Sequence, residues 1–333
     1  QWRAIIPELR YVLGSAFIVG VTSLMNYDLA YLTAVLALGY LAPGAKPLSL
    51  KQSGGFVLIL FLINVFDLVF TQVFLDYHIV FMPLLALMLL DLYYTDKLAP
   101  TVKLFALVSI LVIPFVSIES NAIGAFVAGK LVFNAFMAIF LSQLVFWVFP
   151  ICEADLVFEK KANETVSISE RDRLVQALNI MLVVLPVLIL FYMFNWSSGM
   201  LILIFVALLS MSPALSSPKV GLVMIVANTL GGLFGIIAYK LLVIVPNFTY
   251  MILVILAVGF FFAQRVFSDR KTAGIFGSAF STFLLILGSV TSSDAEAGEE
   301  VWVRVIQIAA AVTYVVLSFG LLNHFLKRKT EES

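Results

Sequence analysis

Residues 56–78 read FVLILFLINVFDLVFTQVFLDYH, a run dominated by Phe, Leu, Ile and Val. It is longer than the roughly 20 residues that a helix needs to cross a lipid bilayer. Similar runs follow one another along the chain of 333 residues, of which 62% are hydrophobic and only 12% are charged. Soluble domains carry about 25% charged residues. The sequence therefore predicts an all-α, polytopic membrane protein, since helices satisfy their backbone hydrogen bonds internally in lipid.

Twelve apolar runs are separated by breaks that contain charged residues, Gly or Pro, and we expect each run to form one membrane-spanning helix. They cover residues 11–25, 29–42, 54–75, 79–93, 101–118, 122–149, 174–194, 198–212, 220–245, 249–267, 273–291 and 301–325. The second, fourth and eighth runs are short for a span, which indicates tilted, broken or partly re-entrant segments.

The distribution of Lys and Arg predicts the orientation of the chain. If the runs alternate and the N-terminus is cytoplasmic, 17 of the 20 basic residues fall on the cytoplasmic side. The longest loop on the opposite side, TSSDAEAGEE at 291–300, is acidic and contains no Lys or Arg. Cytoplasmic loops carry the excess of basic residues in membrane proteins. We therefore expect a multi-pass protein with both termini in the cytoplasm.

A polar segment at 151–173 divides the chain into residues 1–150 and 174–333, each with six predicted spans. Landmarks recur in the same order in both parts, at an offset of about 163–173 residues: Arg10 with Arg173, the breaks 40–51 with 210–219, and the turns 94–97 with 267–271. The glycines 54–55 are followed in the second part by the glycines of 231–235, which lie slightly deeper in their span. Because six is an even number, both parts enter the membrane from the same side. The pattern predicts two parallel six-helix repeats joined by a cytoplasmic linker, related by an axis along the membrane normal. The alternative is the general similarity of any two apolar bundles.

Asp67 interrupts the run at 56–78 and is the main candidate for transport chemistry. An ionised Asp at mid-membrane costs about 2.5–3.5 kcal/mol or more, so such a residue usually faces the bundle interior and has a function. Asn64 lies one turn before it, and Gln72 follows. The repeat offset aligns Asp67 with the neighbourhood of Lys240, which predicts a proton-handling or charge-pairing group of Asp67, Lys240 and Asn64. The alternatives are a static interhelical pair, and a Lys240 that extends to the membrane interface.

Breaks at Pro43 and Pro213 occupy corresponding positions in the two predicted repeats, and paired breaks of this kind indicate a transporter's binding site. We expect a substrate cavity near these two prolines, with Thr33 and Asn228 contributing to it. Amide side chains inside the spans are also expected to form hydrogen bonds between helices; they are Asn134, Gln143, Asn179 and Asn228. Close helix packing is the simplest role for Gly231 and Gly235.

Several classes of function are not indicated. The chain has no GxxxxGK[ST] loop for ATP and no GxSxG nucleophile motif, so we expect no enzyme activity. His78 and His324 lack the spacing of a metal site, and no cofactor is expected. A formal net charge of zero gives no indication of nucleic-acid binding.

The run AYLTAVLALGYLAPG at 30–44, followed by a basic turn and a glycine pair, resembles the opening of the fusaric-acid-resistance and aromatic-acid-exporter family. Residues 31–35 and Pro43 carry the resemblance, and the six-plus-six layout extends it over both halves. The resemblance implies a bacterial inner-membrane efflux component that draws on the proton gradient and works with a periplasmic adaptor of the membrane-fusion type. Larger members have a sizeable cytoplasmic domain between the halves, so this chain resembles the compact branch of the family.

The function expected from these features is secondary export of small organic anions or drugs, aromatic or amphipathic, coupled to proton entry. Two alternatives stay open: an organic-anion channel, and a non-transporting membrane scaffold. The expected partners are the lipid bilayer, a small-molecule substrate and the adaptor, with homo-oligomerisation left open.

Overall fold

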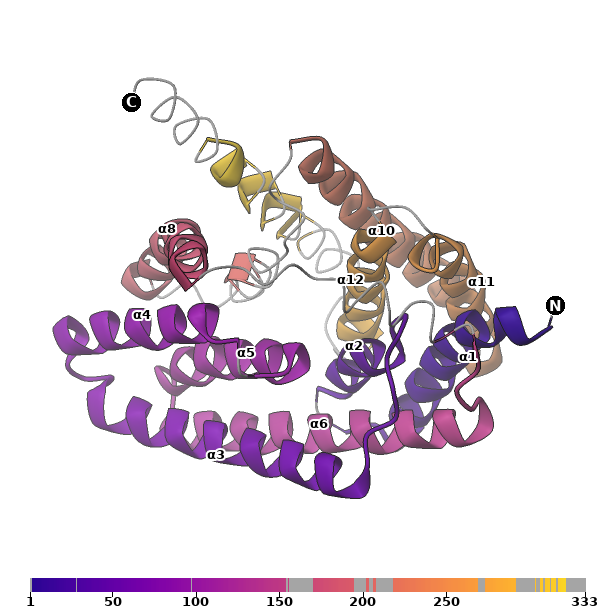
Figure 1. The fold of residues 1–333 in the computed structure, drawn as a ribbon, viewed down its shortest axis with the longest axis horizontal. Helices are drawn as coiled ribbons and strands as arrows, with labels where there is room; N and C mark the ends of the chain where they lie inside the picture. Colours follow the sequence, from indigo (N-terminus) through magenta and orange to yellow (C-terminus); the bar gives the residue numbers. More distant parts are fainter. Residues whose placement is uncertain are drawn as a thin grey trace. The chain divides into compact units, whose positions relative to one another are not determined.

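The computed structural model describes residues 2–27, 29–96, 98–153, 155, 170–194, 202–203, 206–207, 218–268 and 273–291, and, within the last predicted run, residues 303, 306–307, 309–311, 313–315 and 317–321. Every regular element in these residues is an α-helix, which confirms the predicted all-α class (Figure 1). The helices are α1 (Trp2–Met25), α2 (Ala30–Leu41), α3 (Leu50–Phe74), α4 (His78–Tyr94), α5 (Pro100–Ser117), α6 (Asn121–Val148), α8 (Glu170–Phe194), α10 (Pro218–Ile244), α11 (Phe248–Val266) and α12 (Ala273–Thr291).

In the part of the chain that the structure describes, six helices are long and apolar enough to cross a membrane: Ile5–Met25, Leu50–Phe74, Asn121–Val148, Glu170–Phe194, Val226–Ile244 and Phe248–Val266. Other apolar helices of the described residues are shorter. At 12 residues, α2 extends over only about 18 Å, whereas the hydrocarbon core is about 30 Å thick. The short second run predicted from the sequence is therefore a short helix, and Pro43 and Gly44 follow its end.

The chain forms two compact units, and each of them draws segments from both predicted halves. Unit 1 comprises residues 1–55, 133–166 and 226–306, and unit 2 comprises residues 56–132, 167–225 and 307–333. The boundaries at 55/56, 132/133 and 225/226 fall inside α3, α6 and α10. Most of each of these helices therefore belongs to one unit.

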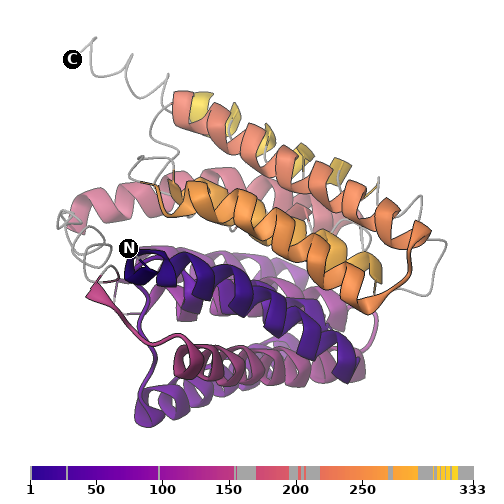
Figure 2. The same ribbon diagram turned by 90° about the vertical axis from the view of Figure 1, so that its right-hand side faces the viewer.

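Unit 1 is held together by close helix contacts. In this unit α1 packs against α2 and α11, and α12 packs against α11 and α2. Figure 2 shows α1 and α11 side by side. A Cβ atom at Gly14 of α1 would lie 2.7 Å from Val145 Cγ1, and one at Gly259 of α11 would lie 3.0 Å from Val12 Cγ1. Small residues allow helix backbones to approach in a membrane, where dispersion contacts replace the hydrophobic effect.

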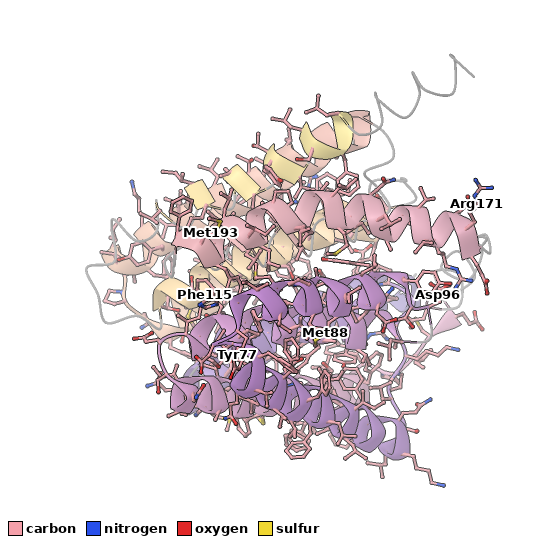
Figure 3. The ribbon with its side chains drawn as sticks, turned by 90° about the vertical axis from the view of Figure 1, so that its left-hand side faces the viewer. Tyr77, Met88, Asp96, Phe115, Arg171 and Met193 are labelled. Atoms are coloured by element: carbon pink, nitrogen blue, oxygen red, sulfur yellow. The ribbon has the colours of Figure 1, made fainter. Side chains whose placement is uncertain are left out.

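In unit 2, α4 packs against α8 and α5. The buried face of α4 carries Phe81, Leu85 and Leu89 at intervals of four residues, each with no exposed surface. Figure 3 shows α8 running along α4, with Tyr77 and Met193 at one end and Asp96 and Arg171 at the other. Arg173 forms an ion pair with Asp96 at this second end.

Helix α3 has an apolar exposed face, and its polar side chains are gathered on the buried face, where they alternate with Phe56, Leu60 and Phe70. Its large apolar side chains at eight positions are 40–58% exposed: Leu58, Ile59, Phe61, Leu62, Val65, Phe66, Val69 and Val73. Its buried face includes Asn64, Asp67 and Thr71. This distribution suits a helix surrounded by lipid and explains why the run at 56–78 tolerates a carboxylate.

Candidate functional site

The candidate site lies in unit 2, on the buried face of α3. Asn64, Asp67 and Thr71 are spaced by three and four residues, so their side chains share one face of the helix. Their exposed fractions are 2%, 1% and 0%. The sequence predicted the first two of these residues as site residues, and both are buried inside the protein as expected.

Asn64 connects α3 to α5. Its Nδ2 donates to the Leu60 carbonyl oxygen at 2.8 Å, and its Oδ1 accepts a hydrogen bond from Ser109 Oγ at 3.4 Å. Ser109 is also fully buried. The Asn64 side chain therefore donates a hydrogen bond within α3 and accepts one from the neighbouring helix.

Asp67 has a different environment. Its Oδ2 is buried and has no hydrogen-bond partner among the described residues, and the same holds for Thr71 Oγ1 one turn further along α3. An ionised carboxylate removed from water without donors is strongly destabilised. Binding of a proton or another small cation would remove that charge, so this group is suited to taking up and releasing a cation.

Lys240 belongs to unit 1, whereas Asp67 belongs to unit 2. The predicted pair of Asp67 and Lys240 therefore joins the two units and stays a prediction. Lys240 is exposed and lies four residues before the end of α10 at Ile244. Such a position suits the alternative in which the lysine extends to the membrane interface.

Thr33, a predicted cavity residue, belongs to a buried polar cluster of unit 1. Its Oγ1 lies 2.7 Å from Asn134 Oδ1 of α6 and 2.6 Å from the Tyr27 hydroxyl oxygen. Thr33 and Asn134 have no exposed surface. Asn134 thus forms the interhelical hydrogen bond expected from the sequence, and Thr33 is its partner.

Asn228 also forms the interhelical hydrogen bonds that the sequence predicts. Its Oδ1 accepts from Ser278 Oγ at 3.0 Å and from Thr282 Oγ1 at 2.9 Å, and both donors belong to α12. A Cβ atom at Gly231 would collide with the Ala279 carbonyl oxygen of the same helix. A Cβ atom at Gly235 would lie 2.9 Å from Ile286 Cγ2. Close packing is therefore the role of both glycines.

The two predicted breaks are only partly described. Pro43 is half-buried in the turn that follows α2, next to Gly44, whose φ angle of 78° favours glycine. Pro213 lies outside the described residues. The predicted cavity near the two prolines stays a prediction.

Thr71 was not among the residues singled out from the sequence, although the helical period indicates it. Residue 71 lies one turn after Asp67, about 40° away around the helix axis, whereas Gln72 lies about 140° away. Gln72 is accordingly exposed. Extending the pattern of Asn64 and Asp67 by four residues would have identified Thr71.

A second buried charge, Arg10 of α1, forms an ion pair with Asp155 in the segment after α6, although its Nε has no hydrogen-bond partner among the described residues. Arg10 Nη1 donates to Asp155 Oδ2 at 3.2 Å, Nη2 bonds to Oδ1, and the guanidinium carbon lies 4.5 Å from the Phe146 ring centroid. Burial by itself raises the pKa of Asp155, but hydrogen bonds from Arg10 and from the Cys152 amide outweigh it and hold the pKa below its usual value. This ion pair is charged and structural.

No family model, curated protein or solved structure matches the chain. Among the described residues, no group of three His, Cys, Asp or Glu side chains could hold a metal ion. The functional interpretation therefore depends on the geometry of the buried polar residues.

Proposed function

We propose that this protein is a proton-coupled secondary exporter of small organic anions, aromatic or amphipathic, and that Asp67 is the group that carries the proton. The observation on which the proposal depends is the 1% exposed Asp67, whose Oδ2 has no partner among the described residues. The outward face of the same helix is apolar. A carboxyl group buried in this way is destabilised when it is ionised. It is therefore suited to bind a proton while buried and to release it when a conformational change exposes it to water.

The proposed architecture is two six-helix repeats whose members are exchanged between the units. The boundary at residue 226 follows that at 56 by 170 positions, and the boundary at 307 follows that at 133 by 174 positions. At each pair of boundaries the chain changes unit in opposite directions. These offsets agree with the offset of the sequence landmarks, and this agreement supports the repeat.

The helix contacts support the same repeat. In unit 1, α1 packs on α11 and α11 packs on α12; in unit 2, α8 packs on α4 and α4 packs on α5. The repeat relates α1 to α8, α11 to α4 and α12 to α5. Each contact of unit 1 in this series therefore has a counterpart in unit 2, which is the arrangement that repeat transporters use.

The substrate class, the bacterial inner membrane and the periplasmic adaptor are proposed from the resemblance of residues 30–44 to the aromatic-acid exporters. The expected orientation places both termini in the cytoplasm, and protons would enter the cell as the organic anion leaves.

The test is efflux from sealed proteoliposomes preloaded with radiolabelled benzenesulfonate, an aromatic anion that stays ionised and does not leak across lipid. With the pH gradient directed inward, we expect efflux from vesicles with the native protein. Asp67→Asn should lower the initial rate about tenfold or more, which corresponds to 1.4 kcal/mol or more. Asp91→Asn, at an exposed position of α4, is the matched control and should leave the rate unchanged.

Three other outcomes would contradict the proposal. Anion currents that do not depend on the pH gradient would assign an organic-anion channel. Absence of flux for benzenesulfonate and for related carboxylates would favour a scaffold. Equal efflux in native protein and Asp67→Asn would remove Asp67 from the mechanism.

A further inference from the structure

The polar face of α3 has a counterpart in α10 of the other unit. Asn64 of α3 accepts a hydrogen bond from a hydroxyl of α5, and Asn228 of α10 accepts hydrogen bonds from hydroxyls of α12. The proposed repeat relates α3 to α10 and α5 to α12. Both units therefore contain an asparagine that joins the same pair of helices through a serine or threonine hydroxyl.

The residues that follow each asparagine differ between the units. Three and seven positions after Asn64 the chain has Asp67 and Thr71, and three and seven positions after Asn228 it has Gly231 and Gly235. These positions lie on the face that carries the asparagine. At these two positions the helix face therefore carries polar side chains in unit 2 and only glycines in unit 1.

In unit 1 this face is closed by direct helix contact. The Ala279 carbonyl group of α12 occupies the position where a Cβ atom of Gly231 would lie, and Ile286 blocks Gly235. Neither position has room for a carboxylate or a hydroxyl group. The asparagine of unit 1 thus serves a fixed contact between α10 and α12.

In unit 2 the corresponding face has two oxygen atoms without partners among the described residues, Asp67 Oδ2 and Thr71 Oγ1. Side chains one helical turn apart have Cβ atoms about 5–6 Å from each other, so both oxygens can contact one small ligand. The negative charge of the carboxylate selects a cation. Burial of 99% or more at both residues excludes a large one.

We propose that one small monovalent cation, a proton or a sodium ion, binds between Asp67 and Thr71 in unit 2, and that the positions at the same spacing after Asn228 in unit 1 form a closed helix contact without this capacity. Thr71 is the positioning residue of the site: its hydroxyl stabilises the ionised carboxylate by hydrogen bonding or ligates the cation with it. The inference rests on the proposed role of Asp67. It adds that the chain has one such cation site and that Thr71 is part of it.

The charged and titratable side chains of the helices packed in unit 2 have other positions or partners. Lys103 of α5 donates to the Tyr93 carbonyl oxygen at 3.2 Å, and Arg173 of α8 pairs with Asp96. Asp91 of α4 is exposed. The hydroxyl of Tyr192 on α8 is buried without a partner among the described residues, and it contributes no charge.

The test is labelling of purified protein in detergent with dicyclohexylcarbodiimide, followed by peptide mass spectrometry and without any transport substrate. A protonated carboxylic acid adds across one C=N bond of this apolar reagent: its oxygen bonds to the carbodiimide carbon and its proton goes to nitrogen. The adduct rearranges to a stable acylurea, and no group leaves. The ionised acid reacts only after it has taken up a proton.

We expect one label for each chain, on the peptide that contains Asp67, and none there in Asp67→Asn. If the cation is a proton, labelling falls about tenfold for each pH unit above the titration of the group. If it is sodium, NaCl suppresses labelling at constant pH and an equal concentration of choline chloride does not. Either result supports the site and identifies the cation.

Thr71→Val and Thr71→Ser then test the second residue. In Thr71→Val, about tenfold more sodium should be needed to suppress labelling, or labelling should persist to a pH about one unit higher than in the native protein. The reason is that a hydrogen bond to a charged group is lost. Thr71→Ser keeps the hydroxyl and should behave as the native protein.

Labelling that is absent at Asp67 at every pH, or is suppressed alike in Thr71→Val and native protein, would overturn the inference. Because the labelling needs no substrate, a correct cation site would still be detected if the export proposal failed.

Discussion

Asp67 and Asp155 are both almost fully buried, but their surroundings give the two carboxylates opposite properties. Asp155 accepts hydrogen bonds from the Arg10 guanidinium and from the Cys152 amide, the latter at 2.9 Å. Asp67 Oδ2 accepts none from the described residues. A buried carboxylate with a paired cation and donors stays ionised, whereas one without them gains by binding a cation. This difference separates a structural charge from a transport candidate.

The Arg10–Asp155 pair predicts an acid-dependent loss of stability. The pKa of Asp155 in the folded protein lies below the unfolded value of about 3.9. Between these two pKa values the unfolded state binds more protons than the folded state. The stabilisation is therefore complete above about pH 4 and is lost as the pH falls through the lower folded pKa. Asp155→Asn should lower the free energy of unfolding by about 3–5 kcal/mol at pH 7, since it leaves Arg10 buried without a counter-charge.

Unfolding of detergent-solubilised protein, followed by circular dichroism between pH 3 and 7, measures both effects. Asp155→Asn should also lose the part of the acid dependence that this carboxylate supplies. Equal stability of the variant and the native protein at pH 7 would show that the ion pair does not support the fold.

At the scale of the helix, glycine lies in open space in α3 but at a close helix contact in α10. Gly54 and Gly55 near the start of α3 have no atom within 4 Å of an added Cβ, whereas Gly231 and Gly235 of α10 face α12 directly. Both helices contain two glycines close together in the sequence. Only the pair in α10 carries a close helix contact.

Gly231→Ala should therefore destabilise the protein, because its methyl group collides with the Ala279 carbonyl group and α12 must move. We expect a loss of about 1–3 kcal/mol, typical of an overpacked core. Gly54→Ala is the matched control, and we expect it to be neutral or to stabilise by up to about 1 kcal/mol through helix propensity. Thermal unfolding in detergent compares the two variants, and equal effects would contradict the assigned contact.

At the scale of the whole molecule, the two compact units do not follow the order of the chain. Unit 1 needs α1 and α2 from the first half and α11 and α12 from the second. Neither half alone contains all the helices that bury the core of either unit. We therefore expect folding to depend on both halves being present.

This dependence predicts the behaviour of a split protein. Residues 1–160 and 161–333, expressed separately, should be degraded or should aggregate, because each exposes helix faces that normally pack against the other half. Co-expressed halves should associate and copurify through a tag on one of them. A half that purifies alone as a stable, monodisperse species would contradict the proposed exchange of helices between repeats.

The positions of the helices were predictable to within a few residues for most of the described chain. Predicted runs at 79–93, 174–194 and 273–291 correspond to α4, α8 and α12, because lipid requires a helix to stay apolar along its length. The start of α1 was missed. The helix begins at Trp2 although the predicted run begins at 11, since its first turns contain charged residues that apolarity does not detect.

The candidate site was predictable only in part. The burial of Asp67 followed from its cost in lipid, and Asn64 followed from the helical period. The hydrogen bond of Asn64 to Ser109 joins residues 45 positions apart, and no local pattern indicates such a partner. Arg10 was expected as one of the cytoplasmic basic residues, but its pairing with Asp155 depends on a segment 145 positions away.

The sequence by itself determined that the protein is helical and that its apolar helices suit a membrane, because a bilayer offers no water to an unpaired backbone or an exposed charge. It also determined that Asp67 turns inward. Only the tertiary structure decided which side chains share the interior with Asp67, and that Thr71 and not Gln72 is one of them. It also decided that Gly231 is closed by a neighbouring helix while Gly54 is open. These properties depend on the approach of segments far apart in the chain, which side-chain packing determines and hydropathy does not encode.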